Sequence, residues 1–242
     1  MIPVVLASQS PSRREILAAS GIDPIIIVSE VDESAIESRF AGSVADLTMA
    51  LSAAKARAVV DRVLASPPAQ LATADTAVII AGDSLLEHEG EAIGKPGTAE
   101  RTREVWADIA GAWTELHSGH TLAVLRRANS STANSSTANS STANSSTANS
   151  STASFELVDI RSKRSTTSVL IGEPTPEELE AYIATEEPFH VAGALTIDGY
   201  GGAFVQRLAG DHLTVLGLSL PVIRDLVRDS DLFWPDLWSP RE

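Results

Sequence analysis

The chain has 242 residues, of which 43% are hydrophobic and 21% charged, so it is long enough for one large domain or two small ones. Lys and Arg number 18 against 32 Asp and Glu. The formal net charge of -14 argues against binding to nucleic acid or to anionic membranes, since both depend on excess positive charge. There is no cysteine, which excludes disulfides, thiolate metal sites and cysteine nucleophiles.

The N-terminal sequence MIPVVLASQSPSRRE lacks the basic segment and the long apolar run of a secretory signal peptide. No apolar stretch of the chain reaches the roughly 18 residues that a membrane span requires. We therefore expect a soluble protein of the cytoplasm.

One low-complexity tract interrupts the chain. Five copies of the pentapeptide ANSST occupy residues 128–152, and Ala153 and Ser154 follow them. The tract carries no charge and no aromatic residue, so it cannot bury enough apolar surface to offset the entropy of ordering. We predict a single domain over residues 1–242 with a disordered surface insertion at 128–154, which a fold tolerates because loop entropy grows slowly with length.

Strand and helix patterns alternate along the rest of the chain, which favours an α/β fold with helices packed on a sheet. In chain order, the sequence predicts a strand at 3–7, a helix at about 10–20, a strand at 25–28, a helix at 44–64, a strand at 76–81, a helix at 98–109, strands at 120–125, 155–160 and 166–171, a helix at 174–185, a strand at 203–207 and a helix at 221–227.

The first candidate site lies between the first strand and the first helix, at residues 8–14, which read SQSPSRR. Ser10 is a good N-cap before Pro11, and Ser12 with Glu15 offers an alternative capping box. The N–H groups at a helix N-terminus bind phosphate, and nearby hydroxyl and guanidinium groups add to that binding. The alternative interpretation is a capped helix with solvated arginines.

A carboxylate follows the apolar run Ala77–Ala81, at Asp83. Ligands of α/β sheets bind beyond the carboxyl ends of strands, where a carboxylate can hold Mg²⁺ or accept a proton from water. A turn aspartate between Gly82 and Ser84 is the alternative. Asp75 competes for the same role, but it precedes the strand and lies at its wrong end.

Three further charged residues could join this site. Lys95 lies in a Gly-Lys-Pro turn twelve residues after Asp83, Lys55 interrupts a helix rich in Ala and Leu, and Glu33 ends the acidic run at 30–33. Carboxylate oxygens suit a hard cation, and a lysine on a constrained turn can be aimed. The alternatives are an exposed loop lysine, a snorkelling helix lysine and a solvated acidic face.

The glycine-rich segment at residues 193–202 contains Asp198, which could accept hydrogen bonds from a nucleobase edge on a closely approached backbone. A bend between strands is the alternative. The chain has no Walker A motif and no evident Ser-His-Asp arrangement. Together, the hydroxyls, cations and carboxylates indicate metal-dependent phosphate chemistry.

Six ordered motifs resemble the Maf family, whose members are also called septum formation inhibitor proteins. The motifs are LASQSPSRREIL, SEVDE, LSAAKARAV, AGDSLL followed by GKP, AGALTIDGYGG and GLSLP. The resemblance extends from about Val4 to Val227 and is interrupted only by the ANSST tract.

The resemblance implies the Maf/inosine-triphosphatase-like α/β fold, an elongated mixed sheet with two lobes around a cleft. It implies hydrolysis of a nucleoside triphosphate to monophosphate and pyrophosphate with Mg²⁺ or Mn²⁺, and a house-cleaning role against modified or non-canonical nucleotides. The alternative is a nucleotide-binding regulator of cell division and septum formation with little turnover. Dimers occur in the family, so a homodimer is also expected.

The resemblance assigns roles to individual side chains. It implies five catalytic residues: Asp83, Glu33, Lys55, Lys95 and Arg13. Asp83 and Glu33 would also hold the metal. It implies that six residues bind substrate: Ser8, Ser10, Ser12, Arg14, Ser84 and Asp198. The aspartate would hold the metal or activate the attacking water, and the cations would neutralise charge on the phosphate oxygens. The spacing to Lys95 resembles that of the family and selects Asp83 over Asp75.

Three positions depart from the family's patterns for base selection. Members acting on dTTP and UTP usually carry Arg, Thr and Gln where this chain has Ser12, Ser84 and Asp198, and members acting on 7-methyl-GTP usually carry Trp, Gln and Glu. The chain matches neither set. Because a carboxylate only accepts hydrogen bonds, Asp198 favours the donor-rich edge of guanine.

Overall fold

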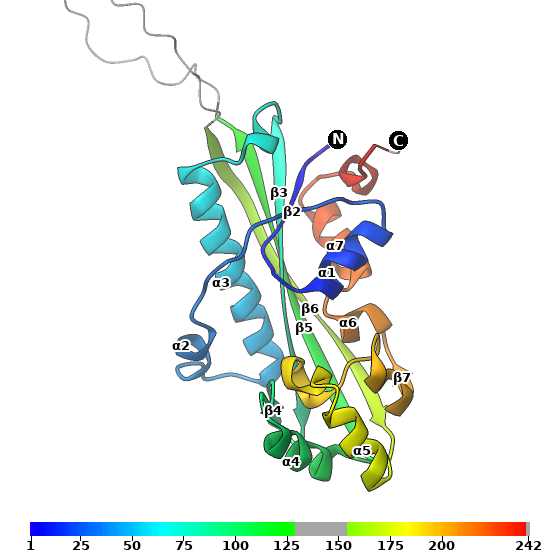
Figure 1. The fold of residues 1–242 in the computed structure, drawn as a ribbon. Helices are drawn as coiled ribbons and strands as arrows, with labels where there is room; N and C mark the ends of the chain where they lie inside the picture. Colours follow the sequence, from blue (N-terminus) through cyan, green and yellow to red (C-terminus); the bar gives the residue numbers. More distant parts are fainter. Residues whose placement is uncertain (129–153, 241–242) are drawn as a thin grey trace, which may run out of the picture.

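The computed structural model describes residues 1–128 and 154–240 (Figure 1). The predicted insertion lies outside the described residues, apart from its end residues Ala128 and Ser154. The N–H of Ala128 donates to the carbonyl of Ser154 at 2.9 Å, so the two flanks of the tract lie side by side. The tract therefore connects two neighbouring strands of the fold.

In the described residues, seven strands form one sheet. They are β1 (Val4–Leu6), β2 (Ile25–Ile26), β3 (Thr76–His88), β4 (Glu91–Ile93), β5 (Trp113–Arg127), β6 (Phe155–Ile171) and β7 (Val205–Ala209).

Seven α-helices accompany the sheet within residues 1–128 and 154–240. They are α1 (Pro11–Ala19), α2 (Glu33–Glu37), α3 (Val44–Ala65), α4 (Ala99–Ile109), α5 (Pro176–Ile183), α6 (His212–Leu216) and α7 (Leu220–Asp229). In the part of the chain that the structure describes, none of the helices has both the length and the apolar character to cross a membrane.

The strand order is β2-β1-β3-β5-β6-β7, with β4 paired to the far end of β3. β1 runs parallel to β2 and β3, and the other pairs are antiparallel. Because β3, β5 and β6 span 13, 15 and 17 residues, the sheet is long and narrow (Figure 1). The structure confirms the α/β class and the elongated mixed sheet, and the cleft between two lobes stays a prediction.

Helices cover both faces of the sheet, and the alternation of side chains along β3 decides which residues meet which helix. Val78 and Ile80 pack in a core with α1 and α7, whereas Ala77 and Ile79 pack in a second core with α3. A third core, around Trp106, joins α4 and α5 to the other end of the long strands. By the same alternation, Asp83 lies on the α3 face of β3.

The long helix α3 packs closely against β5. A side chain at Gly119 would collide with the backbone carbonyl of Thr48, so only glycine permits this approach. The hydroxyls of Ser52 and Thr121 are hydrogen-bonded at 2.9 Å one turn further along the helix. Lys55 follows Thr48 by two helical turns, so it lies on the same buried helix face.

Several predicted boundaries are wrong. The strands predicted at 76–81 and 120–125 continue as β3 and β5, and those predicted at 155–160 and 166–171 are the single strand β6. The polar residues of these strands look like loops in the sequence, but they pair with a neighbouring strand along their whole length. The short elements α2, β4 and α6 were not predicted. The remaining predicted elements are confirmed, with their ends shifted by a few residues.

Candidate active site

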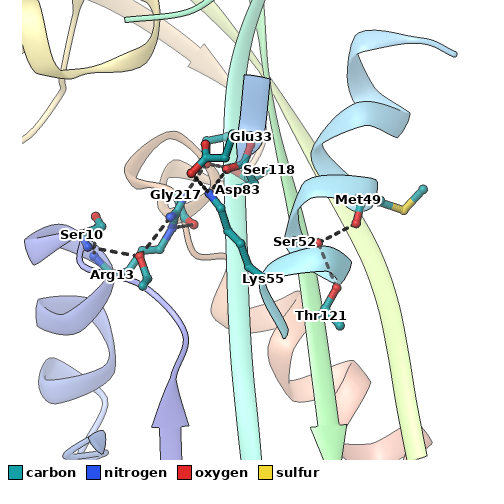
Figure 2. Close-up of polar contacts among 12 residues, drawn as sticks. Ser10, Arg13, Glu33, Met49, Ser52, Lys55, Asp83, Ser118, Thr121 and Gly217 are labelled. Carbon is teal, nitrogen blue, oxygen red and sulfur yellow. Dashed lines mark hydrogen bonds and ion pairs between the residues drawn. The ribbon is translucent and has the colours of Figure 1, made fainter. Parts of the chain in front are cut away.

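The loop between β1 and α1 contributes the predicted residues Ser8 and Ser10, and the first turn of α1 contributes Arg13. Ser10 is the N-cap of α1, and its hydroxyl accepts the N–H of Arg13 at 3.5 Å. The Ser8 hydroxyl accepts the N–H of Ser10 at 3.1 Å, which folds the loop back on itself. Ser10 rather than Ser12 therefore caps the helix, and Arg13 points toward β3 from its first turn (Figure 2).

Three neutral oxygen atoms hold the guanidinium group of Arg13. Its Nε donates to the Gly217 carbonyl at 2.8 Å, and its two terminal nitrogens donate to Ser8 Oγ at 3.2 Å and Ser84 Oγ at 3.1 Å. Burial lowers the pKa of Arg13, and the nearby carboxylates of Asp83 and Glu33 act in the opposite direction. Arginine nevertheless keeps its charge at neutral pH.

Lys55 bridges the two predicted carboxylates (Figure 2). Its Nζ lies 2.5 Å from Asp83 Oδ1 and 3.0 Å from Glu33 Oε1. The Lys55 and Asp83 side chains are 10% and 8% exposed, whereas Glu33, in the first turn of α2, is 49% exposed. Lys55 is thus neither a snorkelling nor a solvated lysine, because its charge is buried between two carboxylates.

Burial also changes the acidity of Asp83. Loss of water raises the pKa of this carboxyl above its usual value, while the charges of Lys55 and Arg13 lower it. A carboxylate with a raised pKa binds a proton more readily than an exposed one. That property suits a group that accepts a proton from water.

Adjacent residues of β3 point to the two faces of the sheet and contact the two cations. Asp83 contacts Lys55 on the α3 face, and Ser84 contacts Arg13 on the α1 face. Asp83 does not follow the end of β3 as predicted, because β3 continues to His88. It lies beyond the end of the parallel neighbour β1, whose last residue, Leu6, pairs with Ile80.

The carboxylates of this cluster suit a divalent cation. Mg²⁺ prefers oxygen ligands and is usually held by one or two carboxylates together with water and substrate phosphates. Asp83 and Glu33 approach the same ammonium group, so these two carboxylates are the candidate ligands. The described residues contain no group of three or more metal-ligating side chains. A cation held by these two carboxylates would need water and substrate oxygens to complete its coordination.

Two predicted residues are not joined to this cluster. Lys95 is exposed in the connection between β4 and α4, and Arg14 is exposed on α1. Within residues 1–128 and 154–240, neither side chain makes a hydrogen bond or an ion pair. Their predicted contacts with substrate remain predictions.

Asp198 lies beside the N-terminus of α1, where it meets one of the predicted base-selecting residues. Ser12 Oγ donates to Asp198 Oδ2 at 3.0 Å, and Thr196 donates to the other carboxylate oxygen. Ser12 and Asp198 border a surface hollow of about 340 Å³ between α1 and the α6–α7 segment. Its other lining residues are Glu15, Ile16, Ala19, Ser20, Leu213, Leu216 and Leu220. Ser84 does not line this hollow, so two of the three positions come together.

The competitor Asp75 lies outside the site. It precedes β3, eight residues from Asp83, which corresponds to about 26 Å along an extended strand. Its side chain is 96% exposed and lies 3.6 Å from Arg127. The preference for Asp83 over Asp75 agrees with this geometry.

The sequence analysis missed the residues that hold Arg13 from the other side. Gly217, in the turn between α6 and α7, accepts from Arg13, and Ser118 of β5 is 2.7 Å from Ser84 Oγ. Gly217 belongs to the GLSLP motif, which was noted without a role. Ser118 has no motif of its own, and only its pairing opposite Ser84 in the sheet reveals it.

Comparison with known proteins identifies the class. Residues 3–230 match the family described as Maf-like protein. The chain belongs to this family.

Full-length relatives agree with the family. The chain is 39% identical to a protein named nucleoside triphosphate pyrophosphatase from Saccharopolyspora erythraea, over 98% of this chain and 97% of the relative. It is 37% identical to a protein of that name from Nocardia farcinica, over 97% and 96% of the two chains. A third, from Streptomyces avermitilis, is 38% identical over 99% and 96%.

Proposed function

We propose that this protein is a nucleoside triphosphate pyrophosphatase, which hydrolyses a nucleoside triphosphate to a nucleoside monophosphate and pyrophosphate. The observation that carries the proposal is the buried carboxylate of Asp83 held beside two cations, Lys55 at 2.5 Å and the guanidinium of Arg13 on the opposite face of β3. The relatives that cover the whole chain carry the same name.

The catalytic roles follow from the contacts. Asp83 accepts a proton from the water whose oxygen attacks phosphorus, and its raised pKa suits this task. Arg13 stabilises negative charge on the phosphate oxygens, because its three hydrogen-bond acceptors are neutral oxygens rather than carboxylates. Lys55 holds the Asp83 carboxylate in position and keeps it ionised.

A divalent cation, Mg²⁺ or Mn²⁺, would be held by Asp83 and Glu33 and would neutralise charge on the phosphate groups. Glu33 is half exposed at the start of α2, so it can turn from Lys55 toward a ligand. Ser8 and Ser10 line the loop that receives the phosphates. Lys95 and Arg14 are exposed and would reach the outer phosphates.

The hollow beside Asp198 would hold the nucleobase. Ser12 and Thr196 already donate hydrogen bonds to the two oxygens of this carboxylate, which orients it. Each carboxylate oxygen can accept a second donor, so the site suits the N–H groups of a guanine edge. We propose a guanine-type triphosphate as the preferred substrate, with Ser84 acting on Arg13 rather than on the base.

In the cell, the proposed role is removal of modified or non-canonical nucleoside triphosphates in the cytoplasm. We also propose that the protein forms a homodimer. The cellular role and the homodimer leave the proposed chemistry of the site unchanged.

The test measures pyrophosphate release with Mg²⁺ across canonical and modified nucleoside triphosphates. Asp83→Asn keeps the shape of the side chain and removes the base, so release should slow by at least about a hundredfold. Asp75→Asn is the matched control, because it changes an exposed carboxylate at the other end of the same strand, and it should retain full activity. If the wild-type protein binds nucleotides without releasing pyrophosphate, the enzyme is excluded in favour of a nucleotide-binding regulator.

A further inference from the structure

Two buried polar side chains of β5 have no part in the proposed chemistry. Ser118 and His120 are fully buried, and they lie two residues apart on the α1 face of the sheet. In the register of the sheet they pair with Ser84 and Gly82, the residues that flank Asp83. Burying a hydroxyl and an imidazole costs free energy unless they form hydrogen bonds, so their partners are informative.

Both side chains bind the segment 214–219, which runs from α6 through the turn at Gly217 to the N-cap of α7. Ser118 Oγ donates to the backbone carbonyl of Thr214 at 2.8 Å, and His120 Nε2 accepts the backbone N–H of Ser219 at 2.9 Å. The two contacts therefore fix both ends of the segment 214–219. Gly217 lies between them.

This turn is the segment that holds Arg13. The carbonyl of Gly217 accepts the Nε–H of Arg13 at 2.8 Å (Figure 2). A Cβ atom on Gly82 would lie 3.1 Å from this Nε and 3.2 Å from the Gly217 carbonyl oxygen. Gly217 has a φ of +99°, which favours glycine, and a side chain there would lie 3.2 Å from both Arg13 Nε and Ser84 Oγ. A shift of the turn would therefore displace the guanidinium group.

Ser118 also determines how Ser84 binds Arg13. A hydroxyl has one hydrogen to donate, and that of Ser118 is used by the carbonyl of Thr214. In the 2.7 Å contact between the two serines, Ser84 must therefore be the donor. Its lone pairs then face Arg13, which donates to it at 3.1 Å.

His120 can accept the N–H of Ser219 only when its Nε2 carries no proton. Since its Nε2 accepts a backbone N–H, its proton is on Nδ1, which has no hydrogen-bond partner among the described residues. Burial and the charge of Arg13 lower the pKa of His120 to about 4, although Asp211 acts in the opposite direction. The imidazole is therefore neutral across the physiological range and remains an acceptor for the turn.

We infer that Ser118 and His120 are positioning residues for Arg13, acting through the Thr214–Ser219 turn and through Ser84. This inference rests on the proposed function, because it concerns the cation that would bind the phosphates. The two side chains fix two of the three acceptors of the guanidinium group. The third acceptor, Ser8, comes from the loop before α1.

The test compares Ser118→Ala and His120→Leu with Thr121→Val in pyrophosphate release. Thr121 is a matched control because it is equally buried on β5 but bonds to Ser52 and Ser162 on the other face. A misplaced catalytic group commonly costs about a hundredfold, so kcat/KM should fall by about tenfold to a hundredfold in the first two variants, mainly through kcat. Thr121→Val should lower the melting temperature but leave kcat near wild type. Ser118→Thr keeps the hydroxyl, so its kcat should be near wild type where that of Ser118→Ala is low.

A double-mutant cycle separates positioning from general destabilisation. In an Arg13→Ala background, Ser118→Ala should cause no further loss of kcat/KM. An equal loss in both backgrounds, or an equal loss in Thr121→Val, would overturn the inference. Circular dichroism at the assay temperature verifies that each variant is folded.

Binding of inorganic tripolyphosphate, measured by calorimetry, distinguishes this inference from the proposed function. If the wild-type protein releases no pyrophosphate, the proposed function is wrong. The inference then stands if Ser118→Ala weakens tripolyphosphate binding only when Arg13 is present. It is overturned if Ser118→Ala binds like wild type, or if the wild-type protein binds no tripolyphosphate.

Discussion

The two faces of β3 hold their cations in different ways. On the α3 face, Lys55 lies between the carboxylates of Asp83 and Glu33, so its charge is already compensated. On the α1 face, Arg13 is held by a carbonyl and two hydroxyls, so its charge is directed but not neutralised. We therefore infer that Arg13 attracts the anion of the substrate, whereas Lys55 controls the position and ionisation of Asp83.

The largest expected effect is at Asp83. Asp83→Asn should lower kcat by about a hundredfold to ten-thousandfold, the usual contribution of a general base. Tripolyphosphate binding should not weaken, because the variant removes a negative charge. Steady-state kinetics and calorimetry measure the two effects, and a variant with wild-type kcat would remove Asp83 from the mechanism.

Arg13→Lys tests the α1 face directly. Lysine keeps the positive charge but cannot donate to three acceptors in one plane. The variant therefore loses the hydrogen bonds that orient the cation and keeps its charge. We expect kcat/KM to fall by about a hundredfold to a thousandfold, as when an aligned charge-stabilising donor is lost. If the variant retained wild-type kcat/KM, the three contacts of Arg13 would have no catalytic purpose.

Lys55→Met tests the α3 face through pH. The charge of Lys55 lowers the pKa of Asp83 against the effect of burial, so removing it should raise that pKa further. Activity requires the ionised carboxylate, so the acidic limb of the kcat/KM profile should move to higher pH. A profile that does not shift, or shifts to lower pH, would contradict the role given to Lys55.

His120 links the α6–α7 turn to pH-dependent stability. The unfolded histidine titrates near 6.5 and the folded one near 4, so between these values the unfolded state binds more protons. Stability should therefore fall as pH drops from 6.5 to 4, by about 3 kcal/mol for this residue alone. Denaturant unfolding at several pH values gives the free energy of unfolding of the wild-type protein and of His120→Gln. The variant should lose less stability between pH 6.5 and 4. If both proteins lose stability equally over this range, His120 does not cause the loss.

The smallest expected effect is at Ser12. Ser12→Ala removes one hydrogen bond to Asp198 at a partly exposed position, so the free energy of unfolding should change by less than about 0.5 kcal/mol. The ratio of guanine to pyrimidine triphosphate hydrolysis should change, because Asp198 loses an orienting donor. Rates for the two substrate classes measure this ratio, and an unchanged ratio would place base selection elsewhere.

Much of the site could be predicted because its residues belong to local motifs. Ser10 follows from helix capping, whereas the resemblance to the Maf family singled out Arg13 and Asp83. Glu33 was harder to place, because an acidic run usually forms a solvated surface. In the structure, Asp32 of this run caps α2 and Glu33 pairs with Lys55.

The residues that could not be predicted depend on sheet register. Ser118 and His120 acquire their roles only because β5 continues past residue 120 in antiparallel pairing with β3. That continuation is invisible in the sequence, since Gly82, Asp83 and Ser84 resemble a turn. Burial on both faces of the sheet, rather than hydrophobicity, keeps this segment in a strand.

The most direct test of the account identifies the products by phosphorus NMR, with a guanine-type triphosphate as substrate. We predict nucleoside monophosphate and pyrophosphate in equal amounts from the wild-type protein, and formation of both at least about a hundredfold more slowly from Asp83→Asn under the same conditions. Nucleoside diphosphate and inorganic phosphate as products, or the same products at the same rate from Asp83→Asn, would contradict it.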